Sequence, residues 1–183
     1  MNTSAPTGST VSTTPFHVVV MGVSGTGKST IATGLADRLG LLLAEGDDFH
    51  PAANVAKMSA GEPLTDDDRT PWLDALAAWT AARHREGVST VLTCSALRRR
   101  YRDRLRAAVP EVPTYFVHLV GSAEVLRRRM TDREHFMPAS LLTSQLDTLE
   151  QLEPDEVGVV VDTDLPVAEV IAAATDWLRV RPG

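Results

Sequence analysis

Short apolar runs alternate with longer segments of helical periodicity along most of the chain. The runs are "HVVVMG" (17–22), "LLLAEGD" (41–47), "STVLTCS" (89–95), "TYFVHLVG" (114–121) and "VGVVVD" (157–162). Their length and β-branched content are typical of buried strands. Because buried strands separated by helices form parallel sheets covered on both faces, we predict a three-layer α/β fold around a five-stranded parallel sheet.

Helices are predicted in the segments between these runs. One follows the first run, and another is expected to start at Thr70 and Pro71, since proline suits the first turn of a helix. Trp72 and Trp79 on this second helix are interpreted as core residues rather than as a platform for a ligand. Further helices are expected at about residues 97–108, 123–132, 138–151 and 166–179.

The segment "MGVSGTGKST" (21–30) carries a nucleotide-binding pattern, G-x-x-x-x-G-K-[ST], between a predicted strand and a predicted helix. Its glycines allow successive N–H groups to face one phosphate, and the helix N-terminus adds a positive dipole. Lys28 is expected to reach the β- and γ-phosphates of ATP, and the Ser29 hydroxyl to ligate Mg²⁺. The predicted ATP-binding residues here are Gly22, Val23, Ser24, Gly25, Thr26, Gly27, Lys28, Ser29 and Thr30.

Acidic residues follow the second predicted strand, in "EGDDFHP" (45–51). Asp47 and Asp48 are expected to differ in role, because adjacent side chains of an extended segment point apart. Asp47 is the candidate catalytic group, a carboxylate that orients a substrate hydroxyl and accepts its proton during phosphoryl transfer. The alternative for Asp47 is a cap of the following turn. His50 is interpreted either as a donor within that turn or as a substrate contact.

Length and composition indicate the domain organisation and the cellular location of the chain. The 183 residues suit one domain, which we assign to residues 16–183, and residues 1–15 resemble a disordered tail rather than a signal peptide. No apolar stretch approaches the roughly 18 residues of a membrane span. The single cysteine, Cys94, excludes an intramolecular disulfide and favours the cytoplasm.

The net charge of −6 argues against nucleic acid as a general partner. Two arginine-rich runs, residues 98–106 and 127–129, therefore need a local explanation. Each is either a solvated helix face or a site that recognises anionic groups of a substrate.

Four blocks of the sequence resemble successive blocks of the gluconokinases, small P-loop kinases of sugar acids. They are "MGVSGTGKST", "EGDDFHPAANVAKMSAGEPLTDDDRTPWL", "CSALRRRYRD" and "HFMPASLLTSQLDTLEQLEPDE", and the similarity covers about residues 16–165. The resemblance implies phosphorylation of D-gluconate at its 6-hydroxyl by ATP with Mg²⁺, a fold like that of the nucleoside monophosphate kinases with a mobile lid, and often a homodimer. Glu45 stands where relatives often carry Asp, which leaves open its contact with metal-bound water.

Gluconate has a carboxylate at one end and the reactive hydroxyl at the other, so its site needs a cation at a distance from Lys28. Arg69 is expected to bind that carboxylate with two parallel hydrogen bonds. The alternative for Arg69 is a surface salt bridge to the neighbouring aspartates 66–68, and Lys57 has the same two interpretations. The predicted acceptor-binding residues are Asp47, His50, Lys57, Arg69, Ser95, Arg98 and Gln145.

A lid is expected at about residues 124–137, where Arg129 and Arg133 lie one helical turn apart. Both are predicted to bind ATP, with Arg133 stabilising the transferring phosphoryl group; a solvated helix face is the alternative. The third predicted strand ends in "LTCS", without the acidic metal ligand that many P-loop enzymes have there. Metal binding is therefore expected to rest on Ser29 and water, with Asp47 or Glu45 holding one of those waters.

Two other functions are weighed against this one. The first is another small-metabolite kinase, of the shikimate or nucleoside monophosphate type, although "CSAL" stands where shikimate kinases have a glycine-rich segment. The second is a regulator that binds ATP without turnover. The combination of Lys28, Ser29, Asp47 and Arg133 favours an enzyme over such a regulator.

Overall fold

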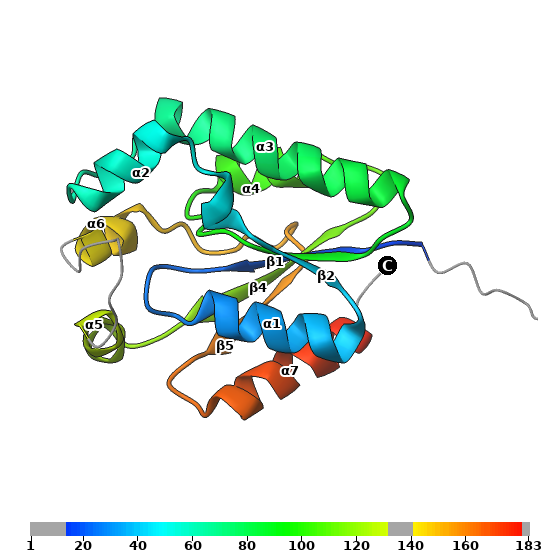
Figure 1. Cartoon of the computed structure of the whole chain (residues 1–183). Coiled ribbons are helices and arrows are strands. Elements are labelled where there is room, and N and C mark those ends of the chain that lie inside the picture. Colours follow the sequence, from blue (N-terminus) through cyan, green and yellow to red (C-terminus); the bar gives the residue numbers. More distant parts are fainter. Residues whose placement is uncertain (1–13, 132–140, 181–183) are drawn as a thin grey trace, which may run out of the picture.

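The computed structural model describes residues 14–131 and 141–180. Within these residues one parallel sheet has the strand order β2-β3-β1-β4-β5, which confirms the expected five-stranded α/β fold (Figure 1). Residues 1–13 of the predicted tail, and the predicted lid beyond Thr131 as far as residue 137, lie outside the described part. The strands are β1 (His17–Met21), β2 (Leu42–Glu45), β3 (Thr90–Thr93), β4 (Thr114–Val120) and β5 (Gly158–Asp162).

Helices cover both faces of this sheet, so the structure has three layers. In Figure 1, α1 and α7 lie on one side of the strands and α3 and α4 on the other. The helices of the described residues are α1 (Lys28–Leu39), α2 (Ala52–Ser59), α3 (Asp66–Arg85), α4 (Arg99–Arg106), α5 (Ala123–Thr131), α6 (Leu141–Thr148) and α7 (Val167–Arg179), with a 3₁₀ turn, η1 (Gly46–Phe49), after β2.

The alternation of side chains along the strands produces a hydrophobic core on each face. In β1, Val18 and Val20 pack with α1 and α7, whereas Val19 and Met21 pack with α3 and α4. The tryptophans of α3 belong to the second core, as the sequence predicted: Trp72 is buried, and Trp79 packs against the cluster. Because helices cover both faces of the sheet, the central strands β1, β3 and β4 are buried almost throughout.

The start of α3 differs from the expectation. The helix begins at Asp66, not at Thr70 and Pro71. Thr65 accepts a hydrogen bond from the backbone N–H of Asp68, whose carboxylate accepts one from the backbone N–H of Thr65. This reciprocal cap satisfies backbone donors of the first turn, so the acidic segment starts the helix and Pro71 lies inside it.

A third apolar cluster lies at the edge of the sheet where the strands end. It joins Val23, in the loop after β1, to residues of α5 and α6 and to Leu97 after β3. The segments that follow β1, β2 and β3 also meet at this edge, since the three strands are parallel neighbours. In α/β sheets this edge is the usual place for a ligand. No helix among the described residues is long and apolar enough to cross a membrane.

Candidate active site

The loop of residues 22–29, here called the P-loop, has a backbone shape that depends on glycines with positive φ. Gly22 has a φ of +142°, and a Cβ there would lie 2.5 Å from the carbonyl oxygen of Leu119, so no other residue fits. Gly27, with a φ of +85°, precedes α1 and gives it no side-chain cap. The first N–H groups of α1 are therefore available to an anion at the end of the helix dipole.

Lys28 folds back over the P-loop. Its ammonium group donates hydrogen bonds to the carbonyl oxygens of Gly22 at 3.1 Å and Val23 at 3.2 Å. Burial lowers the pKa of Lys28, and the carboxylates of Asp47 and Glu45 act in the opposite direction. Phosphate oxygens would be stronger acceptors than these two carbonyls, because they carry negative charge.

Oxygen ligands suited to Mg²⁺ converge beside the start of α1. Ser29 Oγ donates to Glu45 Oε2 at 3.0 Å, and Thr93 Oγ1 donates to the same oxygen at 2.7 Å. A hydroxyl and a carboxylate are ligands that Mg²⁺ prefers. No group of three His, Cys, Asp or Glu side chains placed to hold a metal occurs in the described part of the chain. The hydroxyl of Ser29 and the carboxylate of Glu45 fit a Mg²⁺ ion whose other ligands are water and phosphate. Glu45, rather than Asp47, is the carboxylate that contacts Ser29.

Asp47 and His50 lie on the turn that follows β2. His50 is buried and stacks on Trp72, with 4.1 Å between the ring centroids. Burial lowers the pKa of His50, so the ring is neutral at pH 7. Its Nδ1 lies 3.2 Å from the amide nitrogen of Asn54 and accepts a hydrogen bond from it, which leaves the ring proton on Nε2. Nε2 lies 3.9 Å from the carboxylate of Asp47, whose side chain is 63% exposed.

One cavity collects most of the predicted acceptor residues. It is bordered by the P-loop, η1, the segment between α2 and α3, the connection after β3, and α6. Gln145 of α6 also accepts a hydrogen bond from the backbone N–H of Ser24, at 2.7 Å, and so joins α6 to the P-loop. Among the predicted site residues, those that line this cavity are Ser24, Lys28, Asp47, His50, Arg69, Ser95 and Gln145.

Arg69 borders the cavity, whereas two other predicted cations do not. Its guanidinium donates to the carbonyl oxygen of Leu64 and lies 5.6 Å from the centre of the Tyr101 ring. Lys57 instead forms an ion pair with Asp68, at 2.8 Å from both carboxylate oxygens, which is the interpretation we weighed against substrate binding. Arg98 is half-buried directly before α4 and is not among the described residues that line the cavity.

Other residues of the cavity have no signal in the sequence that points to a ligand. Met58, Glu62 and Leu64 come from α2 and the segment that follows it, and Ser144 comes from α6. In the sequence, "GEPL" stands out solely as part of a block that resembles the gluconokinases. Family resemblance was therefore the one signal available for the segment with Glu62 and Leu64.

A second cavity also borders the P-loop, beside α1 and α7. Arg129 of α5 lines it together with Thr30, both of which were predicted to bind ATP. Arg129 is held there by hydrogen bonds to Thr163, at 2.6 Å to its carbonyl oxygen and 3.3 Å to its hydroxyl. Leu165 and other residues after β5, which the sequence did not indicate, complete the wall. Arg133 lies outside the described residues.

Comparison with known proteins identifies the family. A family model described as an AAA domain matches residues 18–152. A gluconokinase of Gluconobacter oxydans (strain 621H) is 56% identical over 143 residues, which cover 78% of this chain and 79% of that protein. The chain belongs to the gluconokinase family. The thermoresistant gluconokinase of Escherichia coli (strain K12) is 40% identical over 163 residues, which cover 88% of this chain and 92% of that protein.

A solved structure supports the same family. The crystal structure of a gluconokinase from Sinorhizobium meliloti 1021 is 46% identical, with a TM-score of 0.82 over 91% of this chain and 93% of that one. The resemblance that the sequence suggested is thereby confirmed, together with the P-loop kinase fold.

Proposed function

We propose that the chain transfers the γ-phosphoryl group of ATP to the 6-hydroxyl of D-gluconate, with Mg²⁺ bound at Ser29 and Glu45. Membership of the gluconokinase family makes the chain an ATP-dependent kinase of gluconate. The observation that carries the assignment of roles is one cavity bordered both by Lys28 of the P-loop and by Arg69. The cavity thus offers a cation to each end of a bound sugar acid: Lys28 at the end that receives the phosphoryl group and Arg69 at the carboxylate.

ATP binds through the backbone N–H groups of the P-loop and the ammonium of Lys28. Its base occupies the cavity beside Arg129, where Leu165 and Val167 supply apolar surface. When bound, Mg²⁺ supplies positive charge to the β- and γ-phosphates. Lys28 leaves its two carbonyl acceptors for the phosphate oxygens and stabilises the negative charge of the transferring group. Arg133 is proposed to assist it from the lid.

Asp47 acts on the acceptor hydroxyl. Its carboxylate accepts a hydrogen bond from the 6-hydroxyl and takes the proton as the oxygen bonds to phosphorus and ADP leaves. His50 supports this role, since its Nε2–H lies near the Asp47 carboxylate and its ring is held on Trp72. The side chain of Asp47 is 63% exposed, so an acceptor hydroxyl can reach its carboxylate.

Arg69 binds the carboxylate at the far end of gluconate. Its remaining N–H groups suit a carboxylate, because Leu64 accepts from a single nitrogen, Nη1. Ser95, Gln145 and the carboxylate of Glu62 offer partners for the hydroxyl groups between the two ends. Lys57 and Arg98, which do not line the described cavity, are proposed to act at most indirectly.

We further propose a single kinase domain of residues 16–183 that works in the cytoplasm as a homodimer, without nucleic acid or membrane partners. The net charge of −6 and the single, buried Cys94 support this setting. The dimer rests on family resemblance and is tested by the molar mass in solution from light scattering.

An assay of ADP release with a panel of acceptors tests the function. ADP release is expected to require both gluconate and Mg²⁺, with little turnover of shikimate or AMP. Turnover of shikimate or AMP without turnover of gluconate would contradict the proposal. Binding of ATP with no turnover of any acceptor would indicate the regulator instead.

A further inference from the structure

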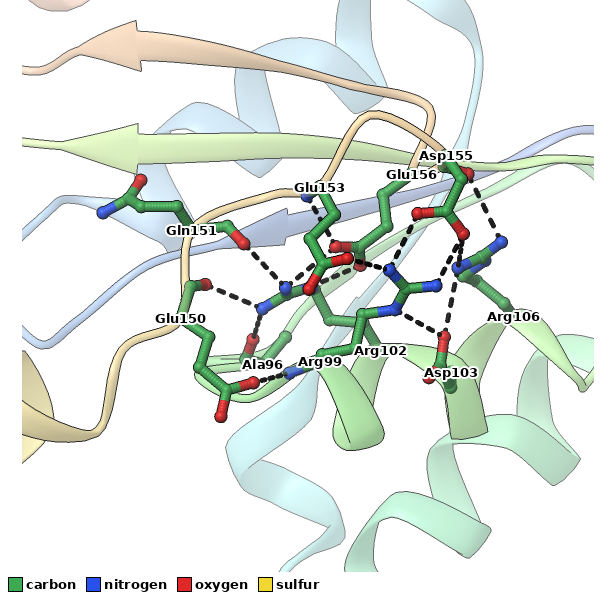
Figure 2. A network of polar contacts seen from close by, with 10 residues as sticks. All are labelled: Ala96, Arg99, Arg102, Asp103, Arg106, Glu150, Gln151, Glu153, Asp155 and Glu156. Atoms are coloured by element: carbon green, nitrogen blue, oxygen red, sulfur yellow. Dashed lines mark hydrogen bonds and ion pairs between the residues drawn. The ribbon is translucent and has the colours of Figure 1, made fainter.

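Arg102 of α4 is fully buried, although it belongs to an arginine-rich run. Its Nε and Nη2 atoms donate to the two carboxylate oxygens of Glu156 at 2.6 and 2.9 Å (Figure 2). The other N–H groups donate to the carbonyl oxygens of Ala96, Glu150 and Gln151 at 3.0 to 3.1 Å. All five donors of the guanidinium are thus used inside the protein.

Ala96 belongs to the connection after β3, and Glu150 and Gln151 follow α6. This connection and α6 both border the cavity that Lys28 and Arg69 line. Ala96 directly follows Ser95 and has a φ of +46°, a conformation that alanine disfavours and that needs support from its surroundings. Glu150 follows the end of α6, and its backbone N–H donates to the carbonyl oxygen of Leu97 at 2.7 Å. The connection after β3 and the end of α6 are therefore joined beside Arg102, as Figure 2 shows for Ala96 and Glu150.

Stability alone does not explain a buried ion pair at this place. Removing two charges from water offsets most of their attraction, so apolar residues often stabilise a core equally well. Burial would raise the pKa of Glu156, but hydrogen bonds from Arg102 and from the backbone N–H of Glu153 outweigh it and lower that pKa. Glu156 therefore stays ionised and holds the guanidinium in one orientation toward the three carbonyls.

We propose that Arg102, oriented by Glu156, is a positioning residue for the acceptor. It fixes the spacing between residues 95–97 and the end of α6, and so determines how closely Ser95 and Gln145 approach gluconate. This inference rests on the proposed function for the identity of the acceptor. Arg102 itself does not line the described cavity and acts through the segments that it holds.

Arg99 is a matched control on the same helix. It lies one turn earlier and pairs with Asp103, Glu153 and Asp155 at the surface (Figure 2). These carboxylates are about half exposed, and exposed ion pairs contribute little to stability. The change Arg99→Lys removes the same planar fork as Arg102→Lys, but its side chain holds none of the three carbonyls.

Steady-state kinetics of wild type, Arg102→Lys and Arg99→Lys test the proposal, with gluconate and ATP varied in turn. Lysine keeps the charge but not the planar fork. Arg102→Lys is expected to raise the KM for gluconate about tenfold and to leave the KM for ATP nearly unchanged. Arg99→Lys is expected to match wild type. A wild-type KM for gluconate in Arg102→Lys, or an equal rise in both KM values, would overturn the proposal.

Glu156→Gln tests the positioning role of Arg102 if the Arg102→Lys variant does not fold. The amide keeps the shape of the carboxylate and one acceptor for Arg102, but it loses the charge that orients the guanidinium. A rise of about threefold to tenfold in the KM for gluconate, again without a change for ATP, supports the positioning role. An unchanged KM for gluconate in the folded variant overturns it.

Hydrogen exchange separates a failure of this inference from a failure of the proposed function, because it needs no acceptor. In Arg102→Lys, or in Glu156→Gln, peptides that cover residues 94–98 and 148–152 should exchange faster than in wild type, and in Arg99→Lys they should not. Faster exchange supports the inference even if the acceptor panel selects another substrate. Unchanged exchange overturns it even if wild type phosphorylates gluconate.

Discussion

The phosphate end of the cavity and its acceptor end are built in different ways. The phosphate end is one continuous loop of backbone between β1 and α1, whose shape is fixed by glycines with positive φ. The acceptor end is assembled from side chains of η1, the segment after α2, α3, the connection after β3, and α6. The shape of the phosphate end therefore follows from its own backbone. The shape of the acceptor end depends on the contacts that hold its segments together.

This difference implies two kinds of support. The N–H groups at the start of α1 are oriented by the backbone of the helix itself, without a side-chain cap. Arg69, in contrast, is aimed by Leu64 and Tyr101, and the segments with Ser95 and Gln145 are joined at Arg102. Changes at the phosphate end, and at Asp47 where the acceptor hydroxyl meets the phosphate, should affect the chemical step. Changes at Arg69 and in the segments joined at Arg102 should affect the binding of gluconate.

The largest expected effect is at Lys28. Lys28→Ala removes the positive charge where negative charge develops during transfer, so kcat should fall by at least about a hundredfold. Steady-state kinetics at saturating ATP and gluconate measure it, with a thermal melt to confirm that the variant is folded. A kcat near that of wild type in the folded variant would remove Lys28 from the chemical step.

The second largest effect on activity is expected for Asp47→Asn. The amide cannot take the proton of the acceptor hydroxyl, so we expect kcat to fall on the order of a hundredfold with a smaller change in the KM for gluconate. Asp48→Asn is the matched control, because Asp48 is adjacent in η1 but does not line the described cavity. Equal losses in both variants would assign Asp47 to the structure of the turn.

Arg69→Lys tests the acceptor end of the cavity. Loss of the fork should raise the KM for gluconate and lower kcat/KM roughly tenfold to a hundredfold, while the KM for ATP changes little. Lys57→Arg, at an ion pair outside the cavity, should have a smaller effect. If Arg69→Lys keeps the wild-type KM for gluconate, the residue is a structural partner of its neighbours and another group binds the carboxylate.

The smallest expected effect concerns the stability of the folded chain at acidic pH. His118 of β4 is fully buried without a hydrogen-bond partner for either nitrogen among the described residues, and burial and the charge of Arg102 lower its pKa to about 4. Between pH 6.5 and 4 the unfolded chain therefore binds more protons at this position than the folded chain. The free energy of unfolding should fall as the pH falls through this range.

Urea unfolding at several pH values measures this dependence. His118→Leu should be folded at pH 7, since the ring has no hydrogen bond to lose within residues 14–131 and 141–180. It should show a shallower fall of the free energy of unfolding between pH 6.5 and 4. The same slope in both proteins would show that His118 does not contribute to it.

The sequence predicted that the P-loop segment joins a strand to a helix, because the determinants of this arrangement are contiguous. The same holds for the strands, whose apolar runs reflect burial on both faces. The prediction from sequence failed where two local signals competed. At α3, the cap at Thr65 and Asp68 starts the helix before Pro71, which was the signal used for the prediction. The sequence also could not tell Arg102 from Arg99, since the partner that buries Arg102 stands 54 residues away.

Determination of the phosphorylated position by NMR of the product tests the central claim most directly. If Arg69 binds the carboxylate while Lys28 and Asp47 act at the other end, wild type should place the phosphate on the 6-hydroxyl of gluconate. Phosphate on an inner hydroxyl, or on the carboxylate as an acyl phosphate, would contradict this arrangement of the two ends.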